Sequence, residues 1–81
     1  MTKIEYCIDI NFPFTHKVMI TFQGDDLWSF NDWCRETFEN MGKQFIMNRE
    51  TFLTTRTEIS TRYILYLESE DMVVMIKLSH G

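Results

Sequence analysis

The chain has 81 residues, of which 44% are hydrophobic and 15% aromatic, and its net charge is −4. This hydrophobic content argues against an intrinsically disordered protein, and the length allows a single domain with enough core for one sheet and one helix. No apolar run approaches the roughly 18 residues that a membrane-spanning helix needs, and no signal-peptide pattern is present. We therefore expect a cytoplasmic protein that does not bind membranes.

The first third of the chain predicts a β-hairpin. Residues 3–12 alternate between apolar and polar side chains, which is typical of a strand with one buried face; the apolar set is Ile4, Tyr6, Ile8, Ile10 and Phe12. Pro13 ends this strand because proline cannot donate to a sheet. Residues 17–23 alternate in the same way, so we expect the two strands to pair antiparallel, with Phe14 in the turn between them.

The segment from Gly24 to Gly42 predicts a helix, because its apolar residues recur at helical spacing: Leu27, Phe30, Cys34, Phe38 and Met41. Gly42 fits the position after the helix, where a left-handed conformation is common.

The start of this helix has two interpretations. Either Asp25 or Asp26 is the N-cap, or Ser29 is the N-cap and Trp28 packs on Trp33 as a hydrophobic staple. The sequence does not choose between them.

The second half of the chain reads as strands. We expect a short strand at 43–47, a turn at 48–50, and strands at 51–59, 62–68 and 72–79; the strand at 62–68 is apolar on both faces and should be central. The element order is then β-β-α-β-β-β. This order predicts an α+β fold, with an antiparallel sheet of four to five strands and one helix packed on one face.

The second face of that sheet has no predicted cover. The residues expected there are partly apolar: Cys7, Asp9, Met19, Ile64, Tyr66, Val73 and Met75. Because a chain of this length cannot cover such a patch, it suggests association, with a homodimer as one possibility.

Nothing in the sequence indicates catalysis, a metal or a cofactor. Cys7 is expected to pair near Thr21 or Phe22, too far along the hairpin from His16 for proton transfer, and Cys34 reads as a buried thiol. The two cysteines with His16 and His80 lack zinc-site spacing. We expect a protein that is not an enzyme.

Binding of a protein partner is the function that the sequence favours. The outer side of the helix is predicted to carry Trp28, Asp32, Arg35 and Glu39, and the neighbouring hairpin turn is predicted to carry Phe14. Tryptophan and arginine are frequent in interface hot spots. Alanine is absent and glycine and proline are scarce, which suggests an AT-rich genome. Our hypothesis is therefore a phage-encoded inhibitor or modulator of a host protein, located in the host cytoplasm.

Single-stranded nucleic-acid binding is the alternative. Between residues 43 and 63, basic side chains alternate with aromatic ones that could stack on bases. The basic residues are Lys43, Arg49, Arg56 and Arg62.

Overall fold

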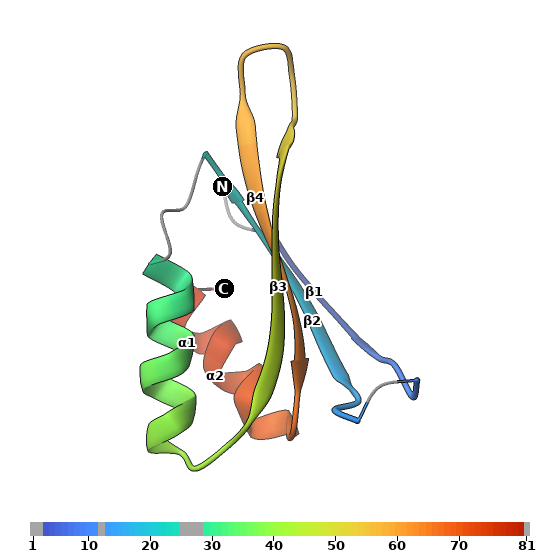
Figure 1. Cartoon of the computed structure of the whole chain (residues 1–81), viewed down its shortest axis with the longest axis vertical. Coiled ribbons are helices and arrows are strands. Elements are labelled where there is room, and N and C mark those ends of the chain that lie inside the picture. Colours follow the sequence, from blue (N-terminus) through green and yellow to red (C-terminus); the bar gives the residue numbers. More distant parts are fainter. Residues whose placement is uncertain (1–2, 12, 25–28, 81) are drawn as a thin grey trace.

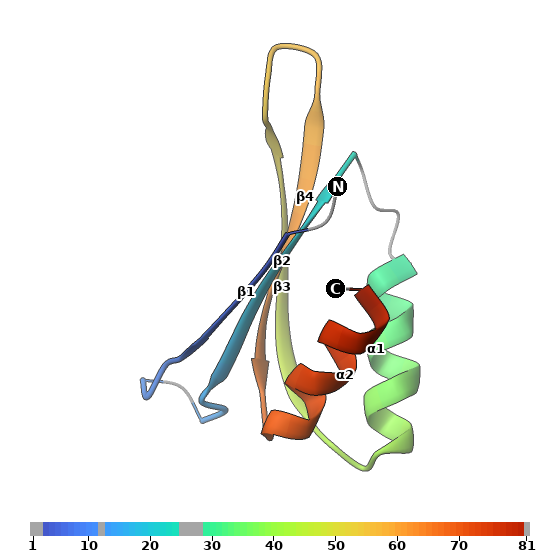
Figure 2. The same ribbon diagram turned by 180° about the vertical axis from the view of Figure 1, so that it is seen from behind.

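A computed structural model describes residues 3–11, 13–24 and 29–80 of the chain. The elements in chain order are β1 (Lys3–Ile8), β2 (His16–Gln23), α1 (Ser29–Asn40), β3 (Phe45–Leu53), β4 (Ile59–Leu67) and α2 (Glu70–His80). The four strands form one antiparallel sheet in the order β1-β2-β4-β3. Both helices lie on the same side of it (Figures 1 and 2). The predicted α+β class with an antiparallel sheet is confirmed.

The predicted β1–β2 hairpin is confirmed, but β1 ends at Ile8 and the connection is longer than expected. The buried face predicted for the first strand is wrong for Tyr6, Ile8 and Ile10, which are exposed because β1 is an edge strand and Ile10 lies beyond its end; only Ile4 is partly buried, and Phe12 lies outside the described residues. Residues 9–11 and 13–15 are the described part of this connection, which is closed by the Asp9 amide donating to the Thr15 carbonyl at 2.8 Å. The Asn11 amide donates to Oδ1 of Asp9 at 3.0 Å, which is an Asx turn. The expected pairing of Cys7 is wrong, because the longer connection brings Cys7 opposite Lys17.

The C-terminus of α1 ends as its glycine predicts. Gly42 has a φ of 69°, and its amide donates to the Glu39 carbonyl at 3.0 Å, while the Lys43 amide donates to the Phe38 carbonyl at 2.9 Å. These two bonds make a Schellman motif, which satisfies carbonyls that the helix leaves without partners.

The start of α1 leaves both sequence interpretations open. Its first helical residue is Ser29. Both interpretations depend on residues 25–28, which include Asp25, Asp26 and Trp28 and lie outside the described residues. The proposed staple of Trp28 on Trp33 lies outside them as well.

The predicted turn at 48–50 is wrong, and so is the strand at 51–59. β3 runs without interruption from Phe45 to Leu53, and Asn48 and Glu50 pair with Ile64 and Arg62 of β4. The polar run that resembled a turn is tolerated because β3 is an edge strand, where alternate side chains remain exposed. The true connection is residues 54–58, and β4 is an inner strand, as predicted for 62–68. The tip of the β3–β4 hairpin projects past the other strands (Figure 1).

The predicted strand at 72–79 is wrong, because this segment is helical. α2 buries Met72, Val73 and Ile76, which share one side of a helix, against the sheet. A short apolar run cannot be assigned to strand or helix by periodicity alone. The charges do contain a helix signal: acidic residues occupy the first turn of α2 and basic residues its last turn, which complements the helix dipole.

The core lies between the sheet and the two helices. Its members are Val18, Ile20, Tyr63, Leu65 and Leu67 from the sheet, Phe30, Cys34 and Phe38 from α1, and Met72, Val73 and Ile76 from α2. Aromatic rings join the layers: Phe38 packs on Phe45 at 5.3 Å between centroids and Phe30 on Tyr63 at 4.9 Å. The His80 ring fixes the end of α2, at 4.6 Å from the Trp33 ring. All of this burial is on one side of the sheet.

Candidate functional site

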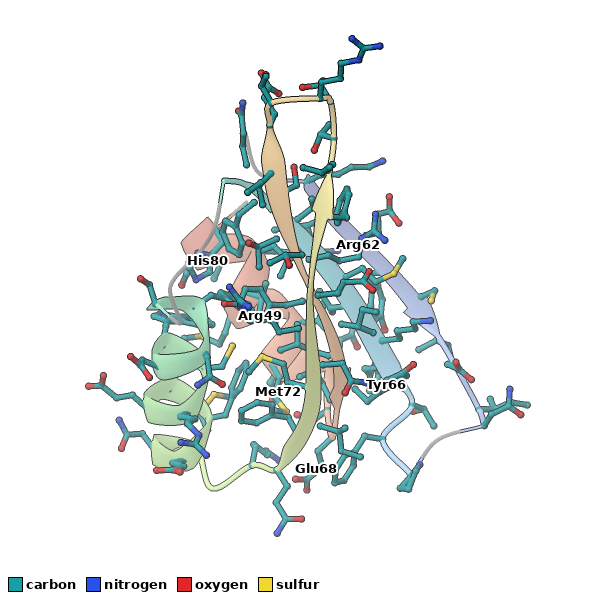
Figure 3. All side chains as sticks on the ribbon, turned by 45° about the horizontal axis from the view of Figure 1, so that its top comes forward. Arg49, Arg62, Tyr66, Glu68, Met72 and His80 are labelled. Atoms are coloured by element: carbon teal, nitrogen blue, oxygen red, sulfur yellow. The ribbon has the colours of Figure 1, made fainter. Side chains whose placement is uncertain are left out.

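The side of the sheet that faces away from both helices is the candidate site, and we call it the open face. Because side chains alternate along a strand and paired residues point the same way, the strand register defines its members. They are Lys3, Glu5 and Cys7 of β1, Lys17, Met19, Thr21 and Gln23 of β2, Ser60, Arg62, Ile64 and Tyr66 of β4, and Ile46, Asn48, Glu50 and Phe52 of β3. Figure 3 shows Arg62 and Tyr66 on the side of the sheet opposite His80 and Met72.

The centre of the open face is apolar. Met19 lies directly opposite Ile64 across β2 and β4, and Tyr66 lies opposite Ile46 across β4 and β3. Tyr66 is itself buried and forms the floor of this region, whereas Met19 and Ile64 are half-buried and Ile46 is 40% exposed. The Lys17 ammonium lies 5.7 Å from the centroid of the Tyr66 ring. The wet face of an antiparallel sheet is usually polar, so this apolar centre is an exception.

Charged pairs occupy one end of the open face. Lys3 Nζ lies 2.9 Å from Glu5 Oε1, and Arg62 Nη1 lies 3.0 Å from Glu50 Oε1. The Lys3 hydrogen bond and charge lower the pKa of the Glu5 carboxyl, with a smaller contribution from the charge of Arg62. The Arg62 guanidinium also lies over the Phe52 ring, 4.7 Å from its centroid. Exposed pairs of this kind add little to stability, so their main effect is on what the face can contact.

Of the residues predicted to bind a protein partner, those that the structure describes do not form one surface. Asp32, Arg35 and Glu39 are all exposed on α1. Phe14 is half-buried in the β1–β2 connection, which lies well away from α1 in both views (Figures 1 and 2). Trp28 lies outside the described residues.

The residues predicted to bind nucleic acid are also dispersed. Arg49 is half-buried on the helix-covered side of β3, whereas Arg62 is on the open face, paired with Glu50. Figure 3 shows Arg49 and Arg62 on opposite sides of the sheet. Arg56 is in the exposed β3–β4 connection, and Lys43 is in the α1–β3 connection. These four side chains do not line one groove.

The predicted second face is correct for four of its seven residues. Cys7, Met19, Ile64 and Tyr66 are on the open face. Val73 and the neighbouring Met75 are instead on α2, and Asp9 follows β1 in the connection. Ile46 and Glu50 were not predicted for this face, because residues 48–50 have the composition of a turn. A continuous β3 would have aligned both with β4.

Titratable groups elsewhere form one small cluster. Tyr6 Oη lies 2.7 Å from His16 Nδ1, and the Lys77 ammonium lies 5.3 Å from the Tyr6 ring centroid. This cluster is on the helix-covered side of β1, whereas Cys7 is on the open face, so the thiol and the His16 imidazole project from opposite sides of the sheet. Within residues 3–11, 13–24 and 29–80, no group of three or more His, Cys, Asp or Glu side chains could hold a metal ion.

Comparisons with protein-family models, with curated proteins and with solved structures found no match to this chain. In the part of the chain that the structure describes, neither helix is long and apolar enough to cross a membrane.

Proposed function

We propose that this chain is a protein-binding module, without a catalytic role, and that it binds through the open face. The observation that carries the proposal is the apolar centre of Met19, Ile64 and Ile46 on a side of the sheet that neither helix covers. An apolar centre with a charged rim is the usual anatomy of a protein interface. Here Lys3, Glu5 and the pair of Arg62 with Glu50 supply that rim.

The outer side of α1 supports binding less well. Every exposed side chain of this helix is polar or charged, including Asp32, Arg35 and Glu39. Such a side is stable in water without a partner. Of these two surfaces, the open face therefore gains more from being covered.

Affinity capture with three matched baits tests the proposal. The baits are the wild-type chain, Ile64→Glu at the centre of the open face, and Leu78→Glu, whose side chain is 78% exposed on α2. Both substitutions replace an aliphatic side chain with a carboxylate, but only the first places that charge in the proposed interface. Ile46→Lys, at a 40% exposed position of the edge strand β3, is a second variant in case Ile64→Glu does not fold.

Each bait is incubated with an extract of the cells that produce the protein and with an untagged copy of the chain. We expect wild type and Leu78→Glu to retain the same proteins, and Ile64→Glu and Ile46→Lys to lose them. Circular dichroism checks that each bait is folded. A folded Ile64→Glu bait that captures the same proteins as Leu78→Glu refutes the proposal.

A further inference from the structure

We propose that the open face binds a second copy of this chain, so that two sheets pack face to face around a two-fold axis parallel to the strands and between β2 and β4. This inference rests on the proposed function, since it names the partner of the same surface. It follows from the strand register, which fixes the position of each side chain of the open face. We call residues that pair with one another across the four strands a row: the central row contains Met19 and Ile64, the charged row contains Lys3 and Glu50, and the apolar row contains Tyr66 and Ile46. The rows can therefore be compared with their own rotated copy.

A two-fold axis along the strands places β1 over the partner copy's β3 and β2 over the partner copy's β4, while each row stays level. In the central row, Met19 then faces Ile64 of the other copy, and Ile64 faces its Met19. The apolar centre is therefore complementary to itself. Sheets packed in this way lie about 10 Å apart and interdigitate their side chains.

The charged end is complementary in the same arrangement. Lys3 of β1 and Glu50 of β3 occupy the two edges of one row, so each copy's Lys3 faces the other copy's Glu50. Aligned sheets cross at about 30°, and the long lysine and glutamate side chains can span the offset that this angle causes at the edges. Two opposite-charge contacts are formed, one at each edge of the dimer.

The other face-to-face two-fold, with its axis across the strands, is disfavoured. In that arrangement the central row faces itself, so Glu5 meets Glu5 of the other copy, and the charged row faces the apolar one, so Glu50 meets Ile46. Like charges and a carboxylate against an aliphatic side chain both oppose association. The register therefore selects the axis along the strands.

The charge distribution favours self-association over repulsion. The chain carries a net charge of −4, but the open face carries three bases, Lys3, Lys17 and Arg62, and two acids, Glu5 and Glu50. The other acids that the structure describes are elsewhere, so two copies that meet through this face do not bring those negative charges together.

The size of the face sets the expected affinity. Four strands about 4.8 Å apart and about eight residues long give a footprint of roughly 19 by 26 Å. The footprint is therefore about 500 Å² on each copy, which is smaller than the roughly 800 Å² that a standard specific interface buries on each partner. We therefore expect a reversible dimer with a dissociation constant in the micromolar range, on the order of 1–100 μM.

A charge-swap experiment tests the arrangement directly. Lys3→Glu alone places a carboxylate opposite Glu50 at both edges of the homodimer, and Glu50→Lys alone places an ammonium opposite Lys3 at both edges. In a heterodimer of the two variants, the two substituted side chains meet at one edge and form an opposite-charge contact there. The wild-type contact of Lys3 with Glu50 remains at the other edge. We expect the dissociation constant of each variant alone to be at least about tenfold higher than that of wild type, and the equimolar mixture to recover wild-type affinity. Sedimentation equilibrium measures these affinities, with the two variants carrying different fluorophores.

The mixture controls for effects within each chain. Lys3→Glu also removes the pair with Glu5, and Glu50→Lys removes the pair with Arg62, but these losses are the same alone and in the mixture. Because Lys3 and Glu50 are both exposed, the variants should fold. Recovery in the mixture therefore reports contacts between copies.

Two results would overturn the inference: wild-type protein that is monomeric at about 1 mM, or a mixture that associates no better than its components. Neither result alone removes the proposed function, which survives if a different protein is captured by the wild-type bait and lost with Ile64→Glu. The proposed function fails separately, when folded Ile64→Glu and Leu78→Glu capture the same proteins.

Discussion

The helical assignment of α2 can be tested with two substitutions that distinguish a helix from a strand. In a strand, Ile76 and Leu78 would point to the same face and be buried together. In α2, Ile76 is fully buried whereas Leu78 is 78% exposed. We expect Ile76→Ala to destabilise the protein strongly and Leu78→Ala to change it little.

The magnitude follows from burial. Truncation of a fully buried isoleucine to alanine costs about 2–5 kcal/mol, and the better helix propensity of alanine returns a few tenths of that. We therefore expect Ile76→Ala to lower the free energy of unfolding by about 3 kcal/mol. An 81-residue domain has about 4–12 kcal/mol in total, so the loss is a large fraction of it. Leu78→Ala should remain within about 0.5 kcal/mol of wild type.

Urea denaturation followed by circular dichroism measures both variants. The protein concentration is held constant, because a dimer makes apparent stability depend on concentration. Melting temperatures should agree, with Ile76→Ala lower by about 12 °C or more, at about 4–8 °C for each kcal/mol. Similar losses for Ile76→Ala and Leu78→Ala would refute the helix and restore the strand.

Two further predictions concern single residues. Burial raises the pKa of the Cys34 thiol from 9.0 to about 12, so at pH 9 about one Cys34 in a thousand is thiolate. A thiol reagent should therefore modify only the exposed Cys7 in the folded protein and both cysteines in denaturant. Rapid modification of native Cys34 would contradict its burial. Gly42 has a φ of 69° with nothing within 4 Å of an added Cβ, so Gly42→Ala should cost about 1–2 kcal/mol from backbone conformation alone, and a loss below about 0.3 kcal/mol in urea denaturation would contradict the left-handed cap.

The sequence predicted the first half of the fold well because its local signals agree with the tertiary structure. Alternation in β1 and β2 fixes which side chains face the helices, and Gly42 ends α1 as its φ requires. A side chain such as Val18 is buried whether one or two helices cover the sheet. Local pattern and final burial therefore coincide in β2 but not in β1, where Tyr6 and Ile8 of the predicted buried face are exposed.

The second half was predicted less well because tertiary context decides it. Residues 48–50 are polar enough for a turn, but pairing with β4 continues the strand through them. Residues 72–79 have the composition of a strand, but as a helix they cover part of the sheet that α1 leaves bare. Neither outcome is determined by a local window, since both depend on which surface needs a partner.

The candidate site shows the same division. Alternation alone identified Met19, Ile64 and Tyr66 as a second face. The register of β3 was needed to add Ile46 and Glu50, and with them the complementarity of the face with its own copy. Single residues selected by type, such as Arg49 and Arg56, were dispersed by the fold.

The central claim is that the open face is an interface between two copies of the chain. Its most direct test is sedimentation equilibrium of the wild-type protein between about 1 μM and 1 mM. The predicted result is an average mass that rises with concentration from 9.8 kDa towards twice that value, with Ile64→Glu remaining at the monomer mass and Leu78→Glu behaving as wild type. A mass that stays at 9.8 kDa across the whole range, or a folded Ile64→Glu protein that dimerises like wild type, would contradict the claim.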